Sequence, residues 1–121
     1  MARRVLVVDD EPDITYAIKV GLQAKGFKVE AFNDPTVALS HFKPDSFDIA
    51  ILDIRMPKMS GFDLYRKMIK VDGHTKIFFL TAFDVYKEEF ERMFPNVKVT
   101  AFLKKPMTIS KLVSRLNELE N

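Results

Sequence analysis

Five polar side chains stand at the ends of short apolar runs, and their types suit phosphate chemistry. Three are carboxylates, one is a hydroxyl and one is an ammonium, in the order Asp9, Asp10, Asp53, Thr81 and Lys105. In an open parallel sheet, ligands bind beyond the carboxyl ends of the strands. We therefore expect these five side chains to converge on one site at that edge.

Three converging carboxylates repel one another, and burying them is costly unless a cation joins them. Mg²⁺ suits such a site, because it prefers oxygen ligands, keeps several waters and typically takes one or two carboxylates with a phosphate oxygen. A metal, a hydroxyl and a lysine around a carboxylate also meet the needs of phosphoryl transfer, in which positioning and charge neutralisation dominate. We predict that Asp53 is the nucleophile and forms an aspartyl phosphate.

The elements that must position these residues alternate between strand and helix. The expected strands are Val5–Val8, Phe27–Phe32, Ile49–Leu52, Lys76–Leu80 and Val97–Leu103. Apolar residues at helical spacing form five stripes, within Ile14–Leu22, Ala38–Phe42, Phe62–Ile69, Tyr86–Phe94 and Ile109–Leu119. Five βα units in a row predict an α/β fold, with a parallel sheet, right-handed crossovers and helices on both faces.

Proline and glycine mark the ends of the expected helices. Pro12 stands near the start of the first helix, where its missing N–H costs nothing, and Gly26 marks the end of that helix. Asp34 followed by Pro35 predicts an N-cap and the first residue of the second helix.

The composition excludes several classes of protein. The chain has 121 residues, enough for one domain, and no cysteine, which rules out disulfides and thiolate chemistry. Its 19 basic and 17 acidic residues are mixed along the chain, which argues against a nucleic-acid surface. No apolar stretch is long enough for a signal peptide or a membrane span. We expect a cytoplasmic domain that contacts neither nucleic acid nor membrane directly.

Four motifs in order resemble a response-regulator receiver domain of the chemotaxis-regulator-like kind, from two-component signalling. They are Val5–Pro12, Asp53–Pro57 with Gly61, Leu80–Ala82 and Lys105–Pro106. One such motif is weak evidence, but four in register at strand ends are specific. The resemblance covers essentially the whole chain and implies a single receiver domain over residues 1–121. It also implies a flavodoxin-like (βα)5 fold, doubly wound, with strand order 2-1-3-4-5 and three α/β/α layers.

The resemblance implies a role for each acidic residue. Asp53 is expected to accept a phosphoryl group from the phosphohistidine of a sensor histidine kinase or phosphotransfer protein, in a Mg²⁺-dependent reaction. Asp10, Asp53 and the backbone carbonyl of Arg55 are expected to contact the metal directly, and Asp9 to act through water. Apart from catalysing its own phosphorylation and dephosphorylation, such a domain is a switch and not an enzyme.

The resemblance also implies how the phosphate is sensed. Thr81 and Lys105 are expected to contact phosphoryl oxygens, and Phe102 stands at the position of the switch aromatic. The output face would be the fourth helix, fifth strand and fifth helix, for a downstream effector or a self-dimer. This face is where the chain departs from the family pattern, because Met93–Val97 replaces the usual small-residue turn.

Simpler interpretations exist for single residues. The Asp9–Asp10 pair could be a solvated loop or a helix cap, and Asp53 could be a turn residue. Thr81 could merely end a strand, and Phe102 could be ordinary core. A further hypothesis is that Arg55, with Phe83, flanks the pocket and slows loss of the phosphate.

Two other functions compete with the phosphoacceptor. A Mg²⁺-dependent phosphatase of the haloacid dehalogenase type would carry its nucleophile after the first strand in an Asp-x-Asp pattern. The sequence there is Asp9-Asp10-Glu11, and no cap domain is present. A binding module that has lost phosphorylation, or a flavodoxin-like cofactor binder, is the other alternative. The C-terminal end, Asn117–Asn121, lacks a linker, which favours a stand-alone regulator.

Overall fold

Five parallel strands form one sheet in the computed structural model, which describes residues 3–82, 91–92 and 101–120. The strands are β1 (Arg4–Val8), β2 (Lys28–Phe32), β3 (Ile49–Asp53), β4 (Lys76–Thr81) and β5 (Ala101–Lys104). Their order is β2-β1-β3-β4-β5, and every neighbouring pair is parallel. The predicted flavodoxin-like order 2-1-3-4-5 is confirmed.

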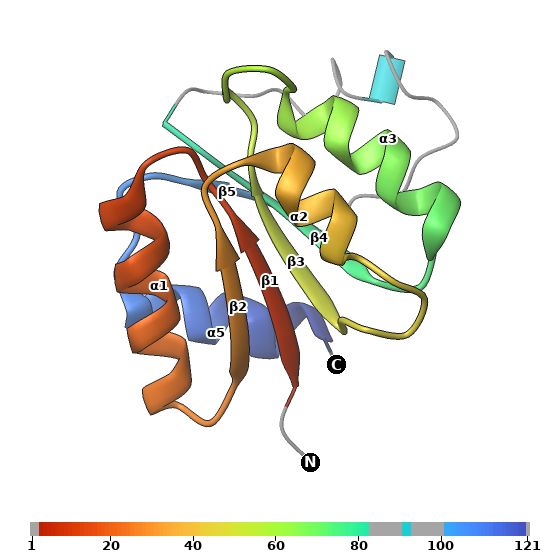
Figure 1. Ribbon diagram of the computed structural model, residues 1–121. Helices are drawn as coiled ribbons and strands as arrows, with labels where there is room; N and C mark the ends of the chain where they lie inside the picture. The colour runs from red at the N-terminus through yellow and green to blue at the C-terminus, as the bar shows by residue number, and fades with distance from the viewer. Residues whose placement is uncertain (1–2, 83–90, 93–100, 121) are drawn as a thin grey trace.

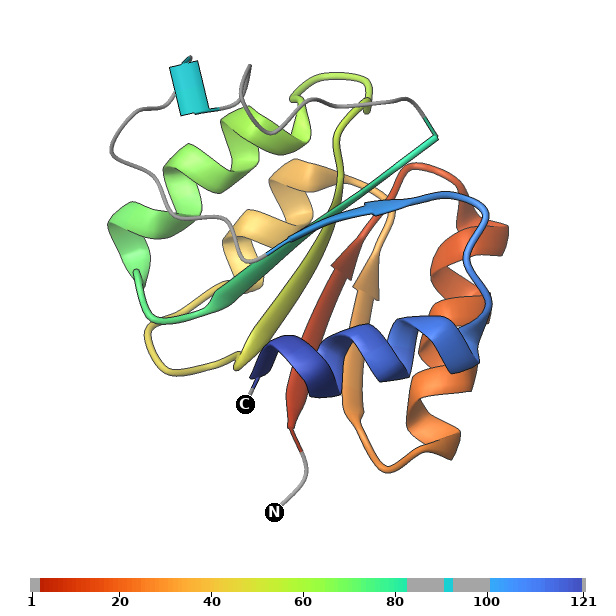
Figure 2. The same cartoon turned by 180° about the vertical axis from the view of Figure 1, so that it is seen from behind.

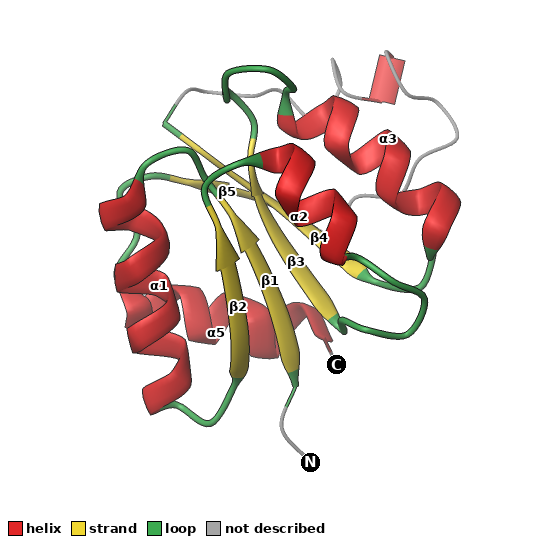
Figure 3. Cartoon of the chain, in the orientation of Figure 1, coloured by secondary structure: helices red, strands yellow, loops and turns green. Residues whose placement is uncertain are grey.

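Helices cover both faces of this sheet. They are α1 (Pro12–Ala24), α2 (Pro35–His41), α3 (Gly61–Val71) and α5 (Ile109–Glu120). Figures 1 and 3 show α2 and α3 over one face, and Figure 2 shows α5 across the other, beside α1. The expected helix within Tyr86–Phe94 and the start of the expected fifth strand lie outside the described residues, apart from residues 91 and 92, which are helical.

The ends of the helices follow from local chemistry. Pro12 opens α1, and Gly26, with a φ of 93°, follows its end in the left-handed region that glycine tolerates. Asp34 caps α2 by accepting a hydrogen bond from the backbone N–H of Thr36 at 2.9 Å. Ser60 caps α3 in the same way, through the N–H of Asp63.

The core is divided by the sheet into two layers. In β1, Val5 and Val7 belong to the layer under α1 and α5, whereas Leu6 and Val8 belong to the layer under α2 and α3. Burying each such side chain stabilises the fold by about 1.5–3 kcal/mol. Because both faces of the central strands are covered, β1 and β3 contain continuous apolar runs, whereas the edge strand β2 has exposed Lys28 and Glu30 on either side of buried Val29.

The apolar stripe predicted within Ile14–Leu22 includes Ala17, and this detail is wrong. Ala17 of α1 is exposed, whereas Thr15, which is polar, is buried. The Thr15 hydroxyl donates to the carbonyl of Pro12 at 3.1 Å and accepts from the amide of Asn33 at 2.8 Å. Burial is therefore compatible with its polarity.

None of the helices in the described part of the chain has the length and apolar character needed to cross a membrane. The loops that follow β1 and β3 lie together at the upper edge of the sheet in Figure 3, which is its carboxyl end. This edge is where the predicted site residues lie.

Candidate functional site

Three aspartates meet at the carboxyl edge of the sheet. Asp53 is the last residue of β3, and Asp9 directly follows β1, the parallel neighbour of β3. Asp9, Asp10 and Asp53 each offer a carboxylate oxygen, and these oxygens lie within 4.8 Å of one another. The side chains of Asp9 and Asp53 are buried, and that of Asp10 is half-buried. The structure thus brings together the three carboxylates that the sequence predicts.

Lys105 brings a positive charge into the same cluster from the end of β5. Its Nζ lies 2.6 Å from Oδ2 of Asp9 and 3.4 Å from Oδ1 of Asp53. The backbone N–H of Lys105 donates to the carbonyl of Thr81 at 2.7 Å, which ties the chain after β5 to the end of β4. The peptide bond from Lys105 to Pro106 is cis. Lys105 therefore contacts both buried carboxylates, whereas Lys104 is exposed.

The carboxylate crowding changes the acidity of Asp53. Burial, followed by the charge of Asp9 and then that of Asp10, raises the pKa of Asp53 from its ordinary 3.8 to about 6, against the opposing charge of Lys105. For Lys105, burial lowers the pKa, but contacts with Asp9 and Asp53 outweigh it and the net shift is upward. One ammonium thus offsets only part of the negative charge in this cluster.

The donor atoms of this cluster fit a hard divalent cation. Asp9 uses Oδ1 to accept a hydrogen bond from the backbone N–H of Glu11 at 2.9 Å. Its buried Oδ2 pairs with the Lys105 ammonium at 2.6 Å. Three carboxylates with oxygens within 4.8 Å of one another, offset by a single ammonium, form the kind of ligand set that Mg²⁺ takes.

The other predicted site residues lie on β4, on β5 and in the loop after β3. Thr81 is buried at the end of β4, next to Lys104 in the β4–β5 register. Arg55 is exposed in the loop after β3, and its carbonyl remains a predicted ligand. Phe102 is half-buried in β5, and its ring stacks on Phe79 with centroids 5.5 Å apart. Phe83, from the hypothesis on phosphate loss, lies outside the described residues.

The sequence did not predict the contacts that fix the backbone of Asp9 and Asp53. The side-chain amide of Asn33, just after β2, donates to the backbone carbonyl of Asp9 at 2.8 Å. A Cβ added to Gly61 would lie 2.2 Å from the backbone oxygen of Asp53, so only glycine fits at this close approach. The motif with Asp53 contains Gly61, but nothing in the sequence shows that Asn33 reaches the first strand.

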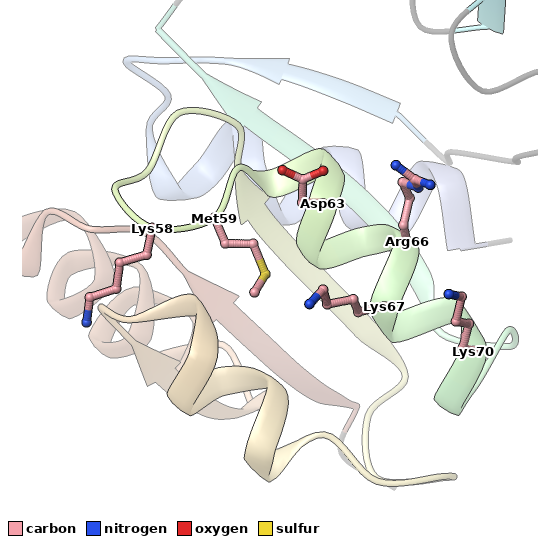
Figure 4. Close-up of a pocket in the computed structure, with 6 residues that line it drawn as sticks. All are labelled: Lys58, Met59, Asp63, Arg66, Lys67 and Lys70. Atoms are coloured by element: carbon pink, nitrogen blue, oxygen red, sulfur yellow. The ribbon is translucent and has the colours of Figure 1, made fainter.

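A groove elsewhere on the surface contains none of the predicted site residues. It has a volume of about 370 Å³ and runs along α3 (Figure 4). Its lining is mostly basic, namely Lys58, Met59, Asp63, Arg66, Lys67 and Lys70. The acidic cluster is therefore a separate feature, identified by its chemistry and not by the size of a cavity.

Comparison with known proteins identifies the family to which this fold belongs. The family described as the response regulator receiver domain matches residues 5–117. The chain belongs to this family. As a receiver domain, it is of the kind found in the response regulators of two-component systems, and the resemblance seen in the sequence is confirmed.

Individual relatives of this receiver domain agree with that assignment. TrcR of Mycobacterium tuberculosis, a transcriptional regulatory protein, is 33% identical over 116 residues, which are 96% of this chain and 44% of TrcR. A CheY-like receiver domain from Methanospirillum hungatei superposes with a TM-score of 0.87 at 26% identity, covering 99% of this chain and 95% of that one. The chemotaxis regulator CheY4 of Vibrio cholerae gives 0.84 at 30% identity, covering 98% and 99%.

The receiver domain spans about half the length of the curated relatives it matches. Several of these are named transcriptional regulatory proteins. The rest of each of these relatives lies outside the match to this chain.

Proposed function

We propose that this receiver domain accepts a phosphoryl group on Asp53 from the phosphohistidine of a sensor histidine kinase or phosphotransfer protein. The observation that carries the proposal is the cluster at the carboxyl edge of the sheet. There, the Asp53 carboxylate stands beside two more carboxylates and the Lys105 ammonium. This combination of a nucleophile, a cation site and a fixed positive charge serves phosphoryl transfer better than it serves folding.

The chemical step is an exchange of one bond to phosphorus for another. An oxygen of the Asp53 carboxylate forms a P–O bond while the P–N bond to the donor histidine breaks. The imidazole leaves with the bonding electron pair and takes a proton from solvent. With a pKa of about 6, Asp53 is mostly ionised at neutral pH and is therefore able to attack.

Charge neutralisation explains the residues around the nucleophile. Asp9, Asp10 and Asp53, with the carbonyl of Arg55, would hold Mg²⁺, which when bound neutralises negative charge on the phosphoryl oxygens. Lys105 already contacts Asp53 and would move its contact to a phosphoryl oxygen as the new group arrives.

The readout would begin at the ends of β4 and β5. The hydroxyl of Thr81 would donate to a phosphoryl oxygen, and Phe102, which stacks on Phe79, would change its packing in response. The surface that includes β5 and α5 would then meet a downstream effector or a second copy of the domain. In this proposal the domain acts as a switch that is phosphorylated and dephosphorylated, and it does not turn over a separate substrate.

The test uses a small phosphodonor in place of the kinase. The protein is incubated with acetyl phosphate with and without Mg²⁺, and its intact mass is measured. We expect a phosphate-sized gain that requires Mg²⁺, disappears in Asp53→Ala and persists in Asp72→Ala, a control at the opposite edge of the sheet. The absence of any gain would favour a binding module, and release of many equivalents of phosphate would favour a phosphatase.

A further inference from the structure

We propose that Asn33 and Asp34, the two residues that follow β2, are positioning residues for the cation site. Asn33 holds the segment with Asp9, and Asp34 acts through Lys58 on the loop that follows Asp53. This inference rests on the proposed function, because it concerns the Mg²⁺ site used there.

Asn33 fixes the backbone on which Asp9 stands. Its Nδ2 donates to the carbonyl of Asp9 and to Oγ1 of Thr15, both at 2.8 Å. The N–H of Asp9 donates in turn to the carbonyl of Phe32 at 3.1 Å. Both polar groups of the Asp9 backbone are therefore held by the end of β2, which restricts where the carboxylate of Asp9 can lie.

The two carboxylate oxygens of Asp34 bind different segments, one the start of α2 and the other the loop after β3. Oδ1 accepts from the N–H of Thr36 at 2.9 Å and from its hydroxyl at 2.7 Å, which caps α2. Oδ2 accepts from Nζ of Lys58 at 2.7 Å. The Lys58 ammonium, with the Thr36 donors, holds the pKa of Asp34 well below its usual range. The carboxylate is thus ionised and available to the loop at neutral pH.

Lys58 belongs to the loop that connects β3, and hence Asp53, to α3. Its φ is 72°, in the left-handed region that a lysine rarely adopts, so this conformation needs support from its surroundings. Figure 4 shows the side chain extending from the loop toward the start of α2. The pair with Asp34 provides support from outside the loop, and the bond from Gly61 N–H to the Ile54 carbonyl, at 2.8 Å, closes the loop from inside.

The two side chains reach segments on opposite faces of the sheet. Asn33 reaches Thr15 in α1, on one face of the sheet, whereas Asp34 reaches the loop before α3, on the other face. One dipeptide therefore holds both segments that carry the carboxylates. Mg²⁺ tolerates little departure from its preferred geometry, so loosening either segment should lower its affinity.

The test measures the Mg²⁺ affinity by isothermal titration calorimetry. We expect Asn33→Ala to weaken binding about tenfold, as loss of an outer-shell partner does. Asp34→Asn should weaken it about threefold, in line with the modest strength of an exposed ion pair. Asparagine caps helices as well as aspartate does, so this change removes the charge and keeps the start of α2.

Variants of Lys58 test whether its pair with Asp34 positions the cation site or only stabilises the protein. Lys58→Gln should match Asp34→Asn, and combining the two should cost no more than either, because both remove one interaction. Lys58→Arg should retain nearly normal affinity. The control is Asp48→Asn, which breaks the Arg4–Asp48 pair at the other edge of the sheet and should leave the Mg²⁺ affinity unchanged.

The outcomes distinguish this inference from the proposed function. A wild-type protein that neither binds Mg²⁺ nor gains phosphate from acetyl phosphate overturns both. Wild-type binding and phosphorylation, with affinities of Asn33→Ala, Asp34→Asn and Lys58→Gln within twofold of normal, overturn the positioning role alone. If Asn33→Ala does not fold, the two surface variants decide, since their changes lie in exposed or half-exposed side chains.

Discussion

Asp53 in the acidic cluster and the aspartates at the amino edge of the sheet lie in opposite electrostatic environments. At the amino edge, Asp48 accepts hydrogen bonds from the backbone and the guanidinium of Arg4, and Asp72 accepts from the N–H groups of Asp45 and His74. These donors lower the pKa of both carboxyls. At the carboxyl edge, burial beside other carboxylates raises the pKa of Asp53. The protein's own donors stabilise the charges of Asp48 and Asp72, whereas Lys105 offsets only part of the cost of ionising Asp53.

This difference separates residues that stabilise the fold from residues kept for function. A carboxyl whose pKa is lowered by folding stabilises the native state at neutral pH, and one whose pKa is raised destabilises it. The acidic cluster therefore carries an electrostatic cost that a bound cation can relieve. Aspartates that look alike in sequence have opposite energetic roles.

The largest expected effect on stability is a steric clash, which is tested by alanine substitutions at two glycines. Gly61→Ala would place a Cβ 2.2 Å from the backbone oxygen of Asp53, whereas the nearest atom to a Cβ at Gly73 is 3.9 Å away. We expect Gly61→Ala to destabilise the protein by about 3 kcal/mol, the cost of a severe overpacking. Gly73→Ala should change stability by less than about 0.5 kcal/mol. Urea unfolding measures both, and equal costs would show that the loop after Asp53 is not tightly packed.

Removing the charge of Asp53 should stabilise the metal-free protein. At pH 7, we expect Asp53→Asn to raise the free energy of unfolding by about 1–2 kcal/mol, because ionising a buried carboxyl of raised pKa costs energy. The penalty should appear as the pH rises from about 4, the unfolded pKa, to about 6, the folded pKa, and then stay constant. Urea unfolding at pH 4 and 7 checks this, and an unchanged or lower stability at pH 7 would contradict it.

Removing the charge of Asp48 should act in the other direction. Asp48→Asn should lower the free energy of unfolding at pH 7 by about 1 kcal/mol, a value reduced by solvent exposure of the pair. Because the folded pKa is lowered, this stabilisation is present above the unfolded pKa of about 4 and is lost as the pH falls through the folded value. The same unfolding series measures it. A stability difference that grows on acidification would be inconsistent with this pairing.

The smallest expected effect is a response to Mg²⁺. Mg²⁺ at three times its dissociation constant should stabilise the wild-type protein by about 0.8 kcal/mol. Asp48→Asn should show the same gain, and Asp53→Asn, which has lost a ligand, a smaller one. Thermal unfolding with and without Mg²⁺ compares the three proteins. Equal gains for wild type and Asp53→Asn would place the cation elsewhere.

The strands and the main site residues could be predicted because their sequence patterns have only one common structural explanation. Continuous apolar runs such as Ile49–Leu52 need cover on both faces, so strand, sheet and carboxyl edge follow from them. Asp53 and Lys105 could be placed because strand ends meet at that edge. Asn33 could not, because a polar residue after a strand has many possible partners, and its bond to Asp9 depends on how β1 and β2 lie side by side.

Other features could not be predicted either, because they depend on contacts between residues far apart in the sequence. Asp34 was predicted as a helix cap from its local sequence, but its pair with Lys58 joins residues 24 positions apart and needs the tertiary structure. The burial of Thr15 likewise depends on its hydroxyl bonding to Asn33. The switch role of Phe102 stays a prediction, because stacking on Phe79 is compatible with ordinary core as well.

The most direct test of the central claim locates the phosphate. Protein treated with acetyl phosphate and Mg²⁺ is reduced with borohydride, which converts an aspartyl phosphate to homoserine, and the peptides are sequenced by mass spectrometry. We predict homoserine at position 53 and at no other aspartate. Homoserine at Asp9 or Asp10, or none despite a phosphate-sized mass gain, would contradict the assignment of Asp53 as the phosphoacceptor.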